Sequence, residues 1–183
     1  GLLSDKLGGP GVFAPQPASV IEMAYGKPEW KTSEGEDRYR RSLYTFAKRT
    51  APFAAYLAFD GPTGESCLPR RDRSNTPIQA LTLMNDPMFG EAADALAIAA
   101  GSAESPGKAL EMLFRRVLTR TPTEQEEKDF LAYYESQRSR LMSGQISTDE
   151  ILGESIESKT EEVAAWKMVA RVLFNLNETI TKG

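Results

Sequence analysis

The sequence predicts a mostly α-helical protein: an irregular helical bundle that follows a coil-rich, Gly/Pro-rich amino-terminal arm, with at most one or two short strands. Three features of the 183 residues support this fold class. Four prolines between positions 76 and 122 directly follow a short polar residue, apolar residues recur at helical spacing in the second half, and residues 1–37 hold six glycines and four prolines. The first two features are typical of helices, and the third argues against long regular elements.

The arm covers residues 1–37, where the glycines and prolines leave room only for a short turn of helix around residues 19–24. The chain begins with Gly1 and not with methionine. We therefore expect it to be a fragment of a larger multidomain protein.

Residues 38–183 form the predicted helical domain. Its first part, residues 38–75, is a basic loop region, and helices are expected from about residue 76 to residue 180. Within the basic region, residues 42–47 alternate in character. This pattern is compatible with one short strand and nearly as well with a helix.

Four helix starts are marked by a polar residue followed by proline. The short side chain can accept a hydrogen bond from an unpaired backbone N–H of the first turn, and proline lacks a donor that would be unpaired there anyway. The four pairs are Thr76-Pro77, Asp86-Pro87, Ser105-Pro106 and Thr121-Pro122. Glu124 lies three residues after Thr121 and predicts a capping box at the last start.

Apolar spacing predicts three helices in the second half of the chain. Residues 110–118 carry a single apolar stripe, and residues 122–142 form a long polar helix that is followed by a break at 143–147. From Trp166 to Ile180, apolar residues follow one another by three or four positions. This spacing predicts one final helix that closes the core.

The composition excludes several classes of site, because histidine is absent and Cys67 is the single cysteine. The chain alone cannot form a Ser-His-Asp triad, a Cys-His dyad or a His-ligated zinc or haem site. An intrachain disulfide, a CxxC redox pair and covalent c-type haem attachment are excluded as well. We expect no cofactor and no metal site. Since no run of about 18 apolar residues is present, no membrane span is expected.

Charge is unevenly distributed along the chain. Residues 38–73 contain eight basic and three acidic residues, a local charge of +5, whereas the formal net charge is −4. Seven of the eight cations are arginines, whose planar fork suits carboxylate, phosphate or sulfate. Either this region binds an anion, or its arginines pair internally with acidic segments such as residues 149–162. Nucleic acid is not an expected partner of an acidic chain.

Two carboxylates, Asp60 and Glu65, lie on a Gly/Pro loop over residues 59–67. As a pair they are candidates for acid/base catalysis on a glycan. The alternative is that they fix the loop through salt bridges.

The arginines after this loop, together with Asn75 at a helix start, are candidates for anion binding: Arg70, Arg71, Arg73 and Asn75. Neighbouring cations can also lower the pKa of Cys67, which makes it a redox candidate. The alternatives are a helix cap for Asn75 and a buried or externally paired thiol for Cys67.

Several segments together resemble a known family. They are EDRYRRSLYTFAKRTAP at 36–52, FDGPTGESC at 59–67 and RRDRSNTPIQALTLMND at 70–86, with the chain's opening and closing segments. They resemble the planctomycete-specific "PSD" family, the C-terminal domain of unknown function of planctomycete cytochrome C domain-containing proteins. The sequence departs from the pattern at Ala47, Gly64 and Ser74.

The resemblance implies an extracytoplasmic protein, periplasmic or secreted, in which a haem module lies upstream of this domain. It implies no established activity. The leading hypothesis is a non-catalytic structural or interaction module that docks on the upstream domains of the same polypeptide or on a protein partner. The alternative is an anionic-polysaccharide binding or glycan-processing domain with an Arg-rich site.

Overall fold

The computed structural model describes residues 2–23, 29–47, 52–62, 69–70, 73–152, 156 and 159–181. Helices make up 61% of it, and no sheet forms among the residues it describes, which confirms the mostly α-helical fold. The chain divides into two compact units, Gly1–Phe89 and Gly90–Gly183. The predicted arm and the basic region both belong to the first unit.

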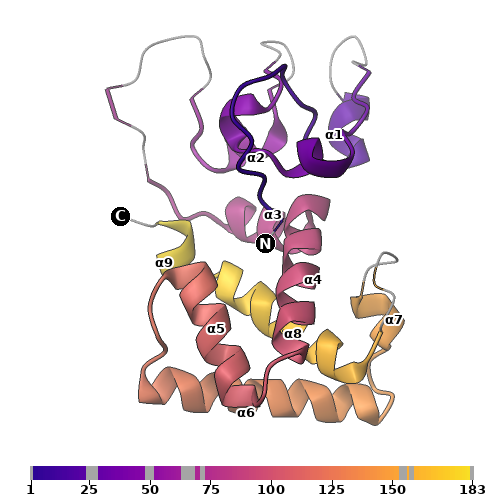
Figure 1. Cartoon of the computed structure of the whole chain (residues 1–183), viewed down its shortest axis with the longest axis vertical. Coiled ribbons are helices and arrows are strands. Elements are labelled where there is room, and N and C mark those ends of the chain that lie inside the picture. The colour runs from indigo at the N-terminus through magenta and orange to yellow at the C-terminus, as the bar shows by residue number, and fades with distance from the viewer. Residues whose placement is uncertain are drawn as a thin grey trace. The chain divides into compact units, whose positions relative to one another are not determined.

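The amino-terminal unit consists of short elements (Figure 1). They are α1 (Ala18–Met23), the 3-10 helices η1 (Gly35–Tyr39) and η2 (Ser42–Tyr44), α2 (Ala54–Ala58), α3 (Pro77–Asn85) and the start of α4 (Pro87–Gly101). The possible strand over residues 42–47 does not form, because its backbone finds only one isolated parallel bridge, between Val12 and Thr45. Residues 42–44 form a 3-10 turn instead.

Aromatic side chains pack the arm against the rest of this unit. The Trp30 ring stacks on Phe53 at 6.0 Å between centroids, and Phe13 meets Trp30 edge to face at 5.2 Å. The Trp30 indole N–H donates to the Ala14 carbonyl at 2.9 Å, so the polar edge of the ring is also paired. Such pairs stabilise a small core beyond the area that they bury.

The carboxy-terminal unit is a helical bundle in which α5 and α8 both pack on α6 (Figure 1). Its helices after α4 are α5 (Pro106–Leu118), α6 (Glu124–Met142), α7 (Thr148–Ile151), α8 (Glu161–Phe174) and α9 (Asn177–Ile180). The predicted stripe on α5 is buried, and the Tyr134 ring stacks on Trp166 at 4.1 Å. This contact joins α6 to α8 at the centre of the core.

The prolines mark helix starts as predicted. Three helices begin at Pro77, Pro87 and Pro106, and α6 begins two residues after Pro122. None of the helices that the structure describes is both long and apolar enough to cross a membrane.

The predicted capping box at Thr121 is wrong. The N-cap of α6 is Thr123, whose hydroxyl accepts from the Glu126 N–H at 3.3 Å, while the Glu126 carboxylate accepts from the Thr123 N–H at 2.8 Å. Both sites satisfy the same sequence pattern, and the chain uses the one after the proline. The box that forms at α3 joins Thr76 to Gln79.

The predicted single helix over 166–180 is two helices. The chain leaves the α8 conformation at Asn175, and α9 starts at Asn177. The Thr179 hydroxyl donates to the Leu173 carbonyl at 2.6 Å, which pairs one of the carbonyls left open by the end of α8.

One buried ion pair links α4 to α8 inside the carboxy-terminal unit. The Lys167 Nζ lies 2.7 Å from Asp94 Oδ1, and both side chains are about nine-tenths buried. Because removal of one partner would leave an uncompensated buried charge, this pair restricts which residues the α4–α8 contact tolerates.

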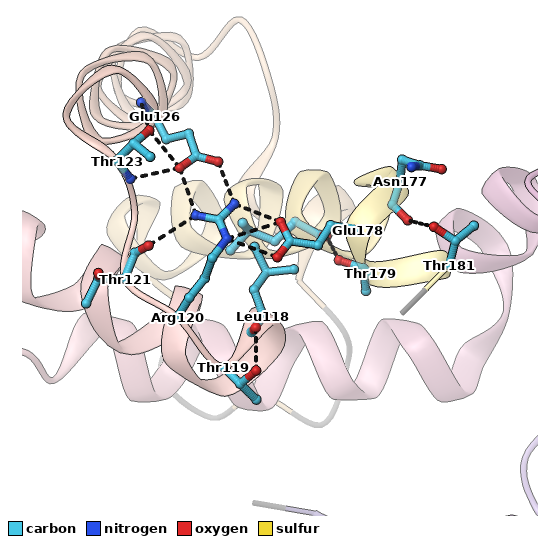
Figure 2. A network of polar contacts seen from close by, with 11 residues as sticks. Leu118, Thr119, Arg120, Thr121, Thr123, Glu126, Asn177, Glu178, Thr179 and Thr181 are labelled. Atoms are coloured by element: carbon cyan, nitrogen blue, oxygen red, sulfur yellow. Dashed lines mark hydrogen bonds and ion pairs between the residues drawn. The ribbon is translucent and has the colours of Figure 1, made fainter. Parts of the chain in front are cut away.

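Arg120 is the centre of a polar network in the carboxy-terminal unit (Figure 2). Its guanidinium lies 2.7 Å from Glu126 and 2.8 Å from Glu178, and its carbon lies 5.3 Å from the Phe114 ring centroid. The network ties the α5–α6 loop to the starts of α6 and α9. Hydrogen bonds from Arg120 lower the pKa of Glu126 to about 2.

The Arg120 network predicts an acid-dependent loss of stability. Because the pKa of Glu126 is depressed in the folded state, its contribution is full above about pH 4.5 and is lost as the pH falls toward 2. Glu126→Gln keeps a residue that can complete the capping box but removes the charge. We expect it to lower the free energy of unfolding by about 1 kcal/mol at pH 7.

Thermal unfolding from pH 7 to pH 2 measures this effect. The difference between wild type and Glu126→Gln should shrink below pH 4.5, whereas the exposed control Glu124→Gln should show a small difference throughout. A Glu126→Gln difference of equal size at pH 7 and pH 2 would contradict the role assigned to the ion pairs.

Candidate functional site

The predicted site residues divide into those that the structure describes and those that it does not. Asp60, Arg70, Arg73 and Asn75 are described. The remaining candidates, Glu65, Cys67 and Arg71, lie outside the described residues, and their proposed roles stay predictions.

Asp60 lies just after α2, in a backbone conformation with φ of 54° that a short polar side chain tolerates. The next residue must be glycine, because a Cβ at Gly61 would come within 2.8 Å of the Tyr56 carbonyl oxygen. The Gly61 N–H donates to this carbonyl at 2.7 Å. A tight turn therefore fixes the direction of the Asp60 side chain.

The Asp60 carboxylate accepts two hydrogen bonds from one residue. The N–H and the hydroxyl of Ser74 both donate to Asp60 Oδ2, at 3.0 and 2.6 Å. These bonds join the two ends of the segment between residues 60 and 74. Asp60 therefore has a loop-fixing contact, made by hydrogen bonds to Ser74, which the sequence did not single out as a partner. The predicted salt bridge and the catalytic role of Asp60 stay predictions.

Ser74 also links Asp60 to α3 by hydrogen bonds. Its hydroxyl accepts from the Gln79 side-chain amide at 2.8 Å, and Gln79 Oε1 in turn accepts from the Thr76 N–H at 2.9 Å. Gln79 is only 1% exposed, so its amide depends on these protein partners. The chain of bonds from Asp60 to Thr76, which we call the Asp60 network, fixes the first turn of α3.

Arg70, Arg73 and Asn75 are exposed. In the part of the chain that the structure describes, no ion pair involves either of the two arginines. They lie just before α3, whose amino-terminal end carries a partial positive charge. An anionic group that approaches this end of α3 would therefore meet two cations that form no ion pair with the described carboxylates.

Two other arginines of the basic region hold the arm within the amino-terminal unit. Arg40 is only 6% exposed; its Nη2 donates to the carbonyls of Lys6 and Gly8 at 2.8 and 2.7 Å. Its guanidinium lies 3.8 Å from the Tyr44 ring centroid, and Arg41 pairs with Asp5 at 3.1 Å. The internal partners of these two arginines lie in the arm, and they are two backbone carbonyls and one aspartate.

The acidic segment 149–162 also has an internal partner. Asp149 pairs with Lys159 at 3.1 Å, within the same segment. Its expected pairing with the basic region stays a prediction. Among the described residues, no group of three or more cysteine or acidic side chains is arranged to hold a metal ion.

The outer face of α3 is a feature that the sequence analysis did not identify. Gln79 and Leu83 are buried, whereas Ile78 and Leu81, three residues apart, are 67% and 58% exposed. Residues 74–85 contain no charged side chain. The segment PIQALTLMN is largely apolar on every side, so only the structure distinguishes the buried face from the exposed one.

The Asp60 network makes a prediction about Ser74. Ser74→Ala removes the hydroxyl that donates to Asp60 and accepts from the buried Gln79 amide. Loss of this acceptor should lower the free energy of unfolding by about 1–3 kcal/mol. Ser139→Ala, at an exposed position of α6, is the matched control and should cost less than about 0.5 kcal/mol. Chemical denaturation measures both, and equal stability of the two variants would show that the network contributes nothing.

Comparison with known proteins adds the family. No curated protein and no solved structure matches the chain. The model of the PSD1 family, described as a protein of unknown function (DUF1553), matches residues 1–134. The match includes the whole amino-terminal unit, the Asp60 network and α3. The resemblance to the PSD family is thereby confirmed: the chain belongs to the PSD1 family of proteins of unknown function.

Proposed function

We propose that the chain is a non-catalytic interaction module that docks on another domain of the same polypeptide or on a partner protein. The observation that carries this proposal is the exposed, uncharged face of α3. Single exposed apolar residues are ordinary on protein surfaces, whereas contiguous exposed apolar patches are typical of contact sites. Ile78 and Leu81 are neighbours of this kind on a helix of nine residues.

The face is held in place before any partner binds. The capping box between Thr76 and Gln79 fixes the first turn, Leu83 is buried on the opposite side, and α3 packs against α2. A preordered contact surface loses little conformational entropy on binding. This arrangement supports docking by α3 as a rigid element.

The resemblance to extracytoplasmic cytochrome-associated proteins supports a location for this module. In the proposal, the protein is periplasmic or secreted, and a haem module of the same polypeptide lies upstream. This chain then supplies contacts, and the redox chemistry belongs to the upstream module.

Photo-cross-linking tests the proposed function. A benzophenone amino acid at position 81 should form a covalent adduct with a discrete protein or an upstream domain in extracts of cells that make the protein. Met142, which is 67% exposed on α6, is the matched control position and should give no such adduct. Addition of Ile78→Asp should abolish the adduct from position 81. Equal labelling from positions 81 and 142, or none from either, would refute the proposal.

The alternative function is binding or processing of an anionic polysaccharide. The observation that favours it is the exposure of Arg70 and Arg73. It predicts that a sulfated oligosaccharide raises the melting temperature by several degrees and that the variant with Arg70→Ala and Arg73→Ala loses this rise. The interaction module predicts no such rise, so thermal unfolding with and without the oligosaccharide separates the two functions.

A further inference from the structure

The outer face of α3 and the two exposed arginines before it occupy adjacent positions in the chain. Arg73 precedes the N-cap Thr76 by three residues, and Arg70 precedes it by six. We propose that this surface binds an acidic, amphipathic segment of a partner polypeptide. Ile78 and Leu81 contact its apolar side chains, and Arg70 and Arg73 pair with its carboxylates. The proposal rests on the proposed function and adds the chemistry of the partner.

The apolar part of the surface requires apolar groups on the partner. Residues 73–85 contain no acidic side chain, and α3 itself contains no charged one. Exposure of the Ile78 and Leu81 side chains to water is unfavourable, and their burial against apolar groups of a partner removes this cost. A free inorganic anion or a sulfated sugar would leave both side chains uncovered.

The charged part of the surface favours anionic groups, which on a polypeptide are carboxylates. The sequence from residue 70 to residue 85 carries three arginines and one aspartate, a net charge of +2 in a chain whose overall charge is −4. The arginine fork binds a carboxylate through two parallel hydrogen bonds, and both exposed forks precede the positive end of the α3 dipole. Charge complementarity therefore favours a partner segment with acidic residues next to its apolar ones.

An anionic membrane is a weaker match for the same surface. Peripheral membrane helices usually combine many lysines with aromatic anchors, and neither residue type is present in α3. The overall negative charge of the chain also opposes its approach to anionic lipid. Binding to a membrane or association of two copies of this chain through α3 would overturn the proposal.

A peptide selection tests the chemistry of the partner. A random library of displayed 16-residue peptides is selected on the wild-type chain after depletion on Leu81→Asp. We expect the selected peptides to be enriched at least twofold in Asp and Glu, to be depleted in Lys and Arg, and to carry Leu, Ile or Phe at helical spacing. Selected peptides without acidic enrichment would overturn the proposal.

A charge exchange makes the test independent of effects on folding. The double variant with Arg70→Glu and Arg73→Glu should bind a selected peptide at least tenfold more weakly by fluorescence anisotropy. It should regain affinity for the same peptide with its acidic residues replaced by lysine. The double variant with Arg116→Glu and Lys128→Glu, at exposed positions of α5 and α6, is the matched control and should bind like wild type.

Other results would overturn the proposal. In the peptide experiments, they are no regained affinity of the charge-exchanged pair and equal affinity of the wild-type chain for the acidic and the lysine-substituted peptide. In other experiments, they are Leu81-dependent binding to phosphatidylserine vesicles without binding to peptide, and a dimer in sedimentation that Leu81→Asp dissociates into monomers. If cross-linking from position 81 captures a protein but the peptides show no acidic preference, only the partner chemistry fails. If neither experiment gives a result, the interaction module itself fails.

Discussion

The buried amide of Gln79 is the constraint on which the candidate surface depends. Its two polar ends reach Ser74 and Thr76, and through Ser74 they reach Asp60. A buried amide without these partners would be costly, so the residues just before α3 and its first turn are fixed together. This coupling explains how a chain segment rich in loops can present a helix face with a defined orientation.

Arginine has different roles in different parts of the chain, and burial explains the difference. Arg40 is buried; its Nη2 donates to two carbonyls, and the Tyr44 ring covers the guanidinium. Within the described part of the chain, Nε and Nη1 find no acceptor. Arg120 is half-buried and bound by two carboxylates. Arg70 and Arg73 lie in solvent, where no internal partner is needed. Recognition of an external anion is compatible only with the exposed arginines.

Local signals predicted much of the fold, and long-range packing decided the rest. The proline pairs placed the helix starts because capping involves only neighbouring residues. Residues 42–44 instead took their conformation from contacts with the distant arm, and the Asp60–Ser74 contact spans 14 residues of sequence. Neither contact leaves a periodic pattern, so the candidate site could be predicted only as a set of residues and not as an arrangement.

The family match ends at a residue inside the hydrophobic core of the carboxy-terminal unit, so the match covers only part of that core. The match ends at Tyr134, inside α6, yet the Tyr134 ring stacks on Trp166 of α8. The apolar stripe of α5 belongs to the same buried cluster as Trp166 and Leu173. Residues beyond the match therefore complete a hydrophobic core that residues within it begin. In contrast, α3 and the Asp60 network lie entirely within the match. The proposed contact surface is thus part of the matched segment, whereas α8 lies beyond it.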